Sequence, residues 1–291
     1  GFLPDNETTR NDMLDYGLEI DYFDTHLARM LSALEDKGEL DNTLILVTSD
    51  NGMPFPRAKA NTYEYGTHMP MACRWGDVVK PGRVVDDFVS FIDLAPTFIE
   101  AAGMAPPKAM SGRSIMPILR SSKSGQVDAE RMHVINGRER HTHARPDNLA
   151  YPCRAIRTHE FLLIWNVKPD RWPAGDPMPG AEGYFDIDGS PSKNVILEEK
   201  GTYFALAVAK RPEYELYAVQ EDPYCLKNLA NNPEYAAAQK ALRAQLEKDL
   251  KAQQDPRMRG SEIVESYPRY SSMRSFPGFK ARGEYNPAYQ E

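Results

Sequence analysis

Leu44-Ile-Leu-Val-Thr-Ser-Asp-Asn-Gly52 is the stretch that decides the fold. Its first half is a compact apolar run with a β-branched character, which predicts a buried strand over residues 43–48. Apolar side chains recur at helical spacing over residues 12–37, and Gly38 follows where a helix C-cap glycine belongs. A helix, a short turn and a buried strand together indicate an α/β sheet that is covered on both faces.

Asp50 and Asn51 come immediately after this strand. Ligands of open α/β sheets bind outside the carboxyl ends of the strands, and a carboxylate beside a carboxamide offers two hard oxygen ligands to Ca²⁺ or Mg²⁺. Asn-Gly is also a common turn dipeptide, so a simple turn is the competing interpretation. Lys59 follows in the next loop, where its charge would neutralise an anion held by the metal; a solvated surface lysine is the alternative there.

A dense basic stretch lies between two predicted strands. It contains Arg138, Arg140, His141, His143 and Arg145. Arginine and histidine side chains in this density suit contact with an anionic ligand, and a solvated polar loop is the alternative. A metal site at the two histidines is not expected, because no third ligand is in sight.

Composition places the chain among ordinary soluble globular proteins. Its 291 residues are 41% hydrophobic and 26% charged, with a formal net charge of −7. The mild acidity argues against nucleic acid as a partner, and no apolar run approaches the roughly 20 residues that span a bilayer. No leader peptide is expected from the first residues. Cys73, Cys153 and Cys225 are too sparse for a disulfide framework or a zinc site.

The character of the chain changes near residue 125. Before it, a strand over residues 69–75, a helix over 84–101 and a short element over 115–119 are predicted, and the first ten residues are expected to be extended. After it, short strands over 132–136, 152–157 and 161–167 predict a smaller antiparallel sheet. We therefore expect two domains, 1–125 and 126–291.

The rest of the second domain is predicted to contain a long loop, a helix and an extended tail. Residues 168–200 are rich in Pro, Gly and Asp and indicate a long loop, in which Asp186-Ile-Asp188-Gly189 departs from the EF-hand pattern and is interpreted as a turn. Asn232-Pro233 is a helix start, followed by an apolar stripe of Leu242, Leu246 and Leu250. The aromatic-rich tail after Asp255 is expected to wrap over the body in extended form.

Several stretches, in this order and spacing, carry a family likeness. They resemble the C-terminal part of type I sulfatases, which belong to the alkaline-phosphatase superfamily. The stretches are residues 44–52, Lys59, Gly66-Thr-His-Met-Pro70, Val89–Phe98 with Ala101-Ala-Gly103, Glu215-Leu-Tyr217, Glu221-Asp-Pro223 and Lys227-Asn-Leu-Ala230. Within the family, the Pro54-Phe-Pro56 loop and Tyr151-Pro-Cys-Arg154 are most similar to heparan N-sulfatases (sulfamidases) and their bacterial relatives.

The resemblance implies a partial alkaline-phosphatase-like α/β fold and a set of site residues. Asp50 and Asn51 would be two protein ligands of a single Ca²⁺, and Lys59 would be the catalytic basic residue on the sulfate group. Asparagine in the pair, where two-metal phosphatases commonly carry a zinc-binding histidine, favours one hard cation. We expect a sulfated, heparan-type carbohydrate as the substrate, bound by His68, Arg138, Arg140, His141 and His143. By resemblance, the compartment would be the periplasm, the lysosome or the exterior.

One departure from the family pattern concerns the nucleophile. Sulfatases make a formylglycine from Cys or Ser in a C/S-x-P/A-S/x-R motif, and none of the three cysteines lies in such a motif. We therefore expect the formylglycine outside this chain and no activity of the chain alone. Two alternatives stay open: a phosphoryl-transfer hydrolase of the same superfamily, which would bind two transition metals, and a non-catalytic carbohydrate-binding fragment or homologue.

Overall fold

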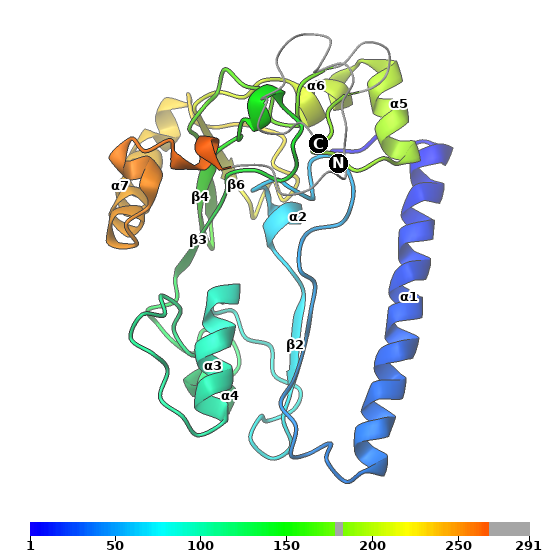
Figure 1. The fold of residues 1–291 in the computed structure, drawn as a ribbon, viewed down its shortest axis with the longest axis vertical. Coiled ribbons are helices and arrows are strands. Elements are labelled where there is room, and N and C mark those ends of the chain that lie inside the picture. Colours follow the sequence, from blue (N-terminus) through cyan, green and yellow to red (C-terminus); the bar gives the residue numbers. More distant parts are fainter. Residues whose placement is uncertain (178–182, 268–291) are drawn as a thin grey trace. The chain divides into compact units, whose positions relative to one another are not determined.

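The computed structural model describes residues 1–177 and 183–267 (Figure 1). The helices and strands, in chain order, are α1 (Glu7–Asp36), β1 (Ile45–Thr48), α2 (Glu64–Thr67), β2 (Met71–Arg74), α3 (Leu94–Ala101), α4 (Met116–Arg120), β3 (His133–Arg138), β4 (Cys153–Thr158), β5 (Phe161–Asn166), α5 (Pro191–Glu199), α6 (Thr202–Val208), β6 (Tyr214–Ala218) and α7 (Ala236–Ala252).

Contacts within the chain divide it into two compact units. Unit 1 comprises Gly1–Met13, Asn51–His68 and Ile135–Glu291, and unit 2 comprises Leu14–Asp50 and Met69–Val134. The chain therefore passes between the units several times, and the expected domain boundary near residue 125 stays a prediction.

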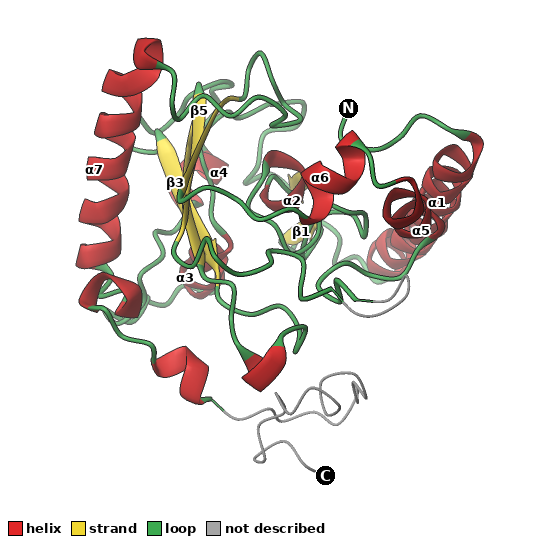
Figure 2. Ribbon diagram, turned by 90° about the horizontal axis from the view of Figure 1, so that it is seen from above, coloured by secondary structure: helices red, strands yellow, loops and turns green. Residues whose placement is uncertain are grey.

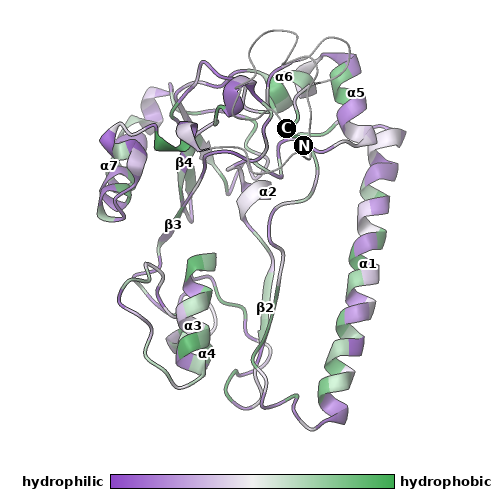
Figure 3. Ribbon diagram, in the orientation of Figure 1, coloured by the Kyte–Doolittle hydropathy of each residue, from purple (hydrophilic) through white to green (hydrophobic). Residues whose placement is uncertain are grey.

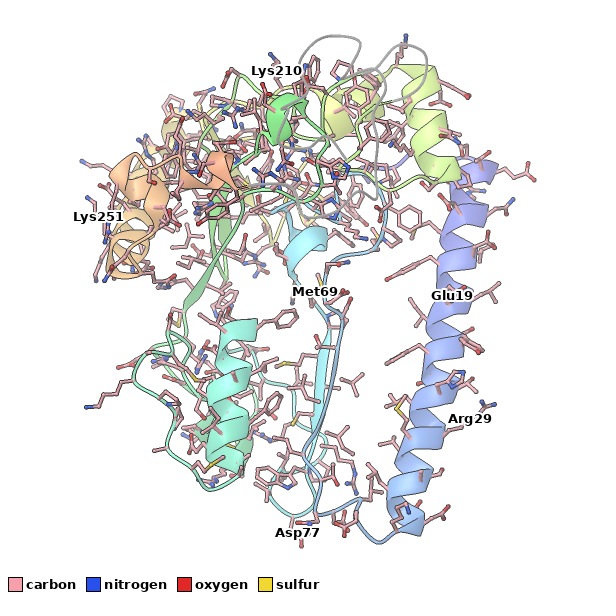
Figure 4. The ribbon with its side chains drawn as sticks, viewed as in Figure 1. Glu19, Arg29, Met69, Asp77, Lys210 and Lys251 are labelled. Carbon is pink, nitrogen blue, oxygen red and sulfur yellow. The ribbon has the colours of Figure 1, made fainter. Side chains whose placement is uncertain are left out.

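Helix α1 begins earlier than the apolar spacing predicts. The Asn6 side chain caps its first turn, because Oδ1 accepts a hydrogen bond from the Thr9 backbone N–H at 2.9 Å. The expectation of an extended lead-in is therefore wrong from residue 7 onward. Polar and apolar residues are interspersed along the helix (Figure 3), and its side chains, with Glu19 and Arg29 labelled, extend from both sides of the ribbon (Figure 4). None of the helices in the described ranges is long and apolar enough to cross a bilayer.

Unit 2 contains an antiparallel strand pair and a small helical core. Strands β1 and β2 pair with Ile45 opposite Arg74, and β1 is half-buried rather than buried as predicted, because β2 is the one strand beside it among the described residues. The expected helix over 84–101 is wrong over its first half, since a single 3₁₀ turn over Phe91–Asp93 precedes α3. Pro96 thus lies in the first turn of α3, where a missing N–H is tolerated.

Unit 1 is built on a four-stranded sheet in the order β3-β4-β5-β6. The structure confirms the predicted strands at β3, β4 and β5. Strand β6 was not predicted, although it contains the family motif Glu215-Leu-Tyr217. Helix α7 lies along one face of the sheet (Figure 2), and its predicted stripe of Leu242, Leu246 and Leu250 is buried against Ile156 and Leu163. The predicted helix start is also confirmed, because Asn232 Oδ1 accepts from the Glu234 backbone N–H at 3.1 Å.

The opposite face of this sheet is covered by chain from the loop that follows β1. Tyr63 is buried there with Ala155, Leu162, Ile164 and Tyr217, and with further residues of the same cluster. The sheet of unit 1 therefore serves as the platform on which residues 51–68 are held.

The expected long loop over 168–200 is wrong in its last part. Ser190 caps α5, since its Oγ accepts from the Lys193 backbone N–H at 3.1 Å, and Pro191 occupies the first helical position. The start of the expected extended tail instead forms two short 3₁₀ helices, Pro256–Arg259 and Ile263–Ser266. The remainder of the predicted tail, residues 268–291, lies outside the described residues.

Candidate functional site

Residues 51–68 form a loop that folds back on itself at two glycines. A Cβ atom on Gly52 would lie 2.1 Å from the carbonyl oxygen of Tyr65, and one on Gly66 would lie 2.4 Å from that of Asn61. Only glycine permits this backbone approach. Arg57 and Ala60 have left-handed backbone conformations, with φ of 70° and 61°. Strain of this kind persists only where the surrounding contacts enforce it.

One such contact is a hydrogen bond deep in unit 1. The Tyr63 hydroxyl donates to Glu215 Oε2 at 2.7 Å, and the Tyr217 hydroxyl donates to the same oxygen at 2.6 Å. The Asn166 amide donates to Glu215 Oε1 at 2.8 Å. Burial raises the pKa of Tyr63 to about 12, so its hydroxyl stays a donor at physiological pH. This carboxylate was missed as a site residue, although it lies in the Glu215-Leu-Tyr217 motif.

Two guanidinium groups provide positive charge around this carboxylate. Arg57 Cζ lies 3.9 Å and Arg211 Cζ 4.7 Å from the centre of the Tyr63 ring. Arg57 Nη1 also donates to the Leu206 carbonyl at 3.0 Å, and Arg211 Nη2 donates to Asn61 Oδ1 at 3.0 Å. The buried charge of Glu215 is therefore hydrogen-bonded and compensated, as buried charges require.

Lys59 extends from this loop toward the segment that precedes α5. Its Nζ donates to Asp188 Oδ2 at 2.7 Å, and the two side chains are 30% and 28% exposed. Lys59 is thus a partly exposed cation held in an ion pair, and its role on a sulfate group stays a prediction. Asp188 belongs to the Asp186-Ile-Asp188-Gly189 stretch, which the sequence marked as a turn without indicating a partner.

Asp186, in the same stretch, binds the basic segment that follows β3. The buried Arg145 guanidinium donates to Asp186 Oδ2 at 2.7 Å, and the Thr142 backbone N–H donates to Oδ1 at 3.0 Å. Burial alone would raise the pKa of Asp186, but Arg145 holds it well below the usual range. Arg145 therefore anchors the basic segment.

The other basic residues of this segment are half-buried. Arg138, the last residue of β3, donates to the Pro173 carbonyl at 2.9 Å, and Arg140 donates to the Val264 carbonyl at 2.9 Å. His141 Nδ1 lies 3.7 Å from Asp186 Oδ1, which is longer than a hydrogen bond. His143 is half-buried as well. These contacts order the segment, and its contact with a substrate stays a prediction.

His68 stands at the end of α2 beside two charged residues. Its Nδ1 lies 2.9 Å from Glu64 Oε1, and Arg157 donates to both Glu64 oxygens, at 2.7 and 2.9 Å. The hydrogen bond to Glu64 raises the pKa of His68. Burial alone would raise the pKa of Glu64, but hydrogen bonds from Arg157 and His68 lower it to about 2. His68 is therefore tied to the C-terminal sheet through Glu64, with its own side chain 74% exposed.

The Glu64 carboxylate predicts an acid-sensitive contribution to stability. Its folded-state pKa is depressed, so the stabilisation is complete above the ordinary pKa of about 4.5 and is lost as the pH falls toward 2. In the full-length protein, the free energy of unfolding should fall over this window, and Glu64→Gln should flatten the fall. Urea titrations at a series of pH values measure this. An unchanged pH dependence in the variant would contradict the assignment.

Asp50 and Asn51 lie where the two units meet along the chain, Asp50 ending a segment of unit 2 and Asn51 beginning a segment of unit 1. Asp50 is exposed and Asn51 half-buried. The Asn51 Nδ2 donates to the Gly52 carbonyl at 2.9 Å, so the amide oxygen is the atom suited to a cation. No group of three or more His, Cys, Asp or Glu residues within the described ranges is arranged to hold a metal. Two oxygen donors fit part of a Ca²⁺ ligand set, which takes six to eight.

Known protein families and individual relatives match most of the chain. The family model for sulfatases matches residues 1–104, and that for the C-terminal part of N-sulphoglucosamine sulphohydrolase matches residues 58–177. An ulvan-active sulfatase of Formosa agariphila is 29% identical over 90% of this chain and 42% of its own length. Human N-sulphoglucosamine sulphohydrolase is 28% identical over 85% of this chain and 49% of its own length.

A solved structure agrees with these relatives. It contains a protein in complex with its substrate, D-glucosamine-2-N,6-O-disulfate, and it matches with a TM-score of 0.57 and 26% identity over 84% of this chain and 40% of the other. The chain thus spans less than half the length of the relatives it matches.

Proposed function

We propose that this chain, which the sulfatase family model matches over residues 1–104 and the model for the C-terminal part of N-sulphoglucosamine sulphohydrolase over residues 58–177, forms the C-terminal part of a sulfatase. The complete enzyme would hydrolyse sulfate ester or N-sulfate groups of a sulfated sugar. Over the part that it covers, the chain has the alkaline-phosphatase-like fold of the sulfatase structures it matches, as the sequence predicted.

The observation that carries the proposal is the placement of Lys59. Lys59 lies on a loop whose conformation is fixed by two glycines and by the Tyr63–Glu215 hydrogen bond. Its ammonium group donates a hydrogen bond to Asp188 at 2.7 Å. An ordered, partly exposed cation is suited to bind sulfuryl oxygens and to stabilise the charge that develops on them in the transition state. The same loop begins with Asn51, which the family resemblance makes a metal ligand.

A calcium ion and a formylglycine would complete the active site of the whole enzyme. Asp50 and Asn51 would supply two oxygen ligands to Ca²⁺, which when bound gives Lewis-acid stabilisation of the sulfuryl oxygens. Formylglycine, from a segment outside this chain, would provide the nucleophile. This chain's own residues then bind the sulfate group through Lys59 and hold the sugar through the basic segment after β3.

Two similarities favour an amino sugar as the substrate. One of the relatives is human N-sulphoglucosamine sulphohydrolase, and one of the matched structures holds a glucosamine disulfate. We therefore propose that the sugar is a sulfated glucosamine of heparan type, contacted by His68 and by Arg138, Arg140, His141 and His143. A carboxylated, sulfated sugar chain brings several negative charges, which such a segment of cations is suited to bind.

The test uses the full-length protein in which this chain lies. We expect it to release sulfate from glucosamine 2-N-sulfate or glucosamine 6-O-sulfate, to lose this activity in a calcium chelator and to regain it with added Ca²⁺. Ion chromatography of the released sulfate measures the rate. Residues 1–291 alone are the matched control and should release none.

Other outcomes would overturn the proposal. Release of phosphate from phosphate monoesters, supported by two transition metals and without sulfate release, would identify a phosphoryl-transfer hydrolase. Binding of heparan fragments with no turnover of either ester would identify a carbohydrate-binding protein. Sulfate release by residues 1–291 alone would refute the external position of the nucleophile.

A further inference from the structure

The Lys59–Asp188 pair is built from two segments that are each held rigidly. On one side, the Lys59 backbone N–H donates to the Met53 carbonyl at 3.1 Å, and Asn61 Nδ2 donates to the Lys59 carbonyl at 2.9 Å. The backbone N–H and the backbone carbonyl of Lys59 are thereby both held by hydrogen bonds, so the loop presents the lysine side chain from a defined point.

On the other side, the segment that carries Asp188 is fixed by a buried lysine. Lys193 Nζ donates to the carbonyls of Gly183, Tyr184 and Ile187, at 3.2, 3.2 and 3.0 Å. Asp186 is held by a hydrogen bond from Arg145, and the segment after Asp188 leads through the cap residue Ser190 into α5. The carboxylate is therefore a preformed partner for Lys59.

A carboxylate at this position has an evident cost for an anion site. Paired with Asp188, Lys59 contributes no net charge, and any sulfate group that reaches its ammonium comes within a few ångströms of a like charge. Repulsion at such distances in a half-exposed site is substantial. A cation meant only for tight anion binding would be better without this neighbour.

We infer that Asp188 is a positioning residue for Lys59 that also weakens retention of the sulfate anion. The carboxylate holds the flexible lysine side chain in one orientation before substrate arrives. After the reaction, its negative charge favours departure of the sulfate dianion, because the ammonium regains its protein partner as the anion leaves. This inference rests on the proposed function, since it assigns to Lys59 the sulfate-binding role.

The experiment uses the full-length protein and inorganic sulfate as the probe. Asp188→Asn keeps the size of the side chain and removes its charge. We expect the variant to bind sulfate about tenfold more tightly, since one nearby like charge is removed. Calorimetric titration with sodium sulfate at constant ionic strength measures the affinity. Inhibition of sugar desulfation by sulfate should sharpen in parallel, with a lowered kcat.

Two further variants separate this role from a structural one. Asp188→Glu restores the charge and should return the sulfate affinity toward that of the unaltered protein, even if the asparagine variant folds poorly. Glu262→Gln removes the carboxylate that pairs with Lys168 on the surface of unit 1, so the net charge changes equally. Sulfate affinity should stay unchanged in this control.

The outcomes that overturn the inference are distinct from those that overturn the function. A purely structural Asp188 predicts weaker or equal sulfate binding in Asp188→Asn, and either result refutes the inference, as does a lack of sulfate binding by both proteins. Absence of turnover by the unaltered enzyme would refute the proposed function. The calorimetric comparison still decides the role of Asp188 in that case, because it needs no turnover.

Discussion

Lys59→Ala in the full-length enzyme is expected to lower kcat for desulfation of glucosamine sulfates by roughly 10²–10³, with a smaller change in KM. The reason is that a preorganised cation stabilises charge that develops on the sulfuryl oxygens mainly in the transition state, and removal of one such donor has an effect of this order. Steady-state kinetics with both sulfated glucosamines measure the two constants.

Two controls accompany this variant. Lys59→Arg keeps a cation and should retain more activity than alanine. Lys251→Ala removes an exposed lysine of α7 (Figure 4), which pairs with Glu247 on the same helix, and should leave both constants unchanged. If Lys59→Ala changed kcat no more than Lys251→Ala, the lysine would be a surface residue and the site assignment would be wrong.

Glu215→Ala should destabilise the protein by about 3–5 kcal/mol, the usual cost of removing one partner from a buried charged network. The substitution removes the hydrogen-bond acceptor of Tyr63, Tyr217 and Asn166. It also removes the negative charge near the guanidinium groups of the buried Arg57 and the half-buried Arg211. Glu215 is 3% exposed, so water cannot replace these interactions without opening the sheet. Urea unfolding of the full-length protein, followed by fluorescence, measures the loss.

Glu213→Ala is the matched control, because Glu213 lies two residues earlier and is exposed. It should change the free energy of unfolding by no more than about 0.5 kcal/mol, as surface substitutions usually do. A loss in Glu215→Ala of similar size would show that the network around Tyr63 contributes little to holding the loop.

The sequence predicted the local elements well where a single physical signal dominated. Strands β4 and β5 follow from two short strand-like runs, and α7 follows from its Asn-Pro start and leucine spacing. Helix α5 was missed although Ser190-Pro191 is a helix start, because the surrounding Gly, Pro and Asp residues indicated a loop.

The anchoring of the candidate site could not be predicted from the sequence. Lys59 meets a partner 129 positions away, and Tyr63 meets one 152 positions away. No periodicity or local motif encodes such distant pairs. The family resemblance identified Lys59 and the Glu215 motif separately. Their relation is visible only in the structure, where Tyr63 of the loop that carries Lys59 donates a hydrogen bond to Glu215.

The close approach at Gly52 and Gly66 has a consequence for enzyme engineering. Because each glycine is fitted to the backbone of residues elsewhere in the same loop, its neighbours cannot be exchanged piecemeal without disturbing that fit. A designer who wishes to transplant Lys59 into another scaffold should therefore move residues 51–68 together. The recipient scaffold must also provide a buried carboxylate that accepts the hydrogen bond from the Tyr63 hydroxyl, as Glu215 does here.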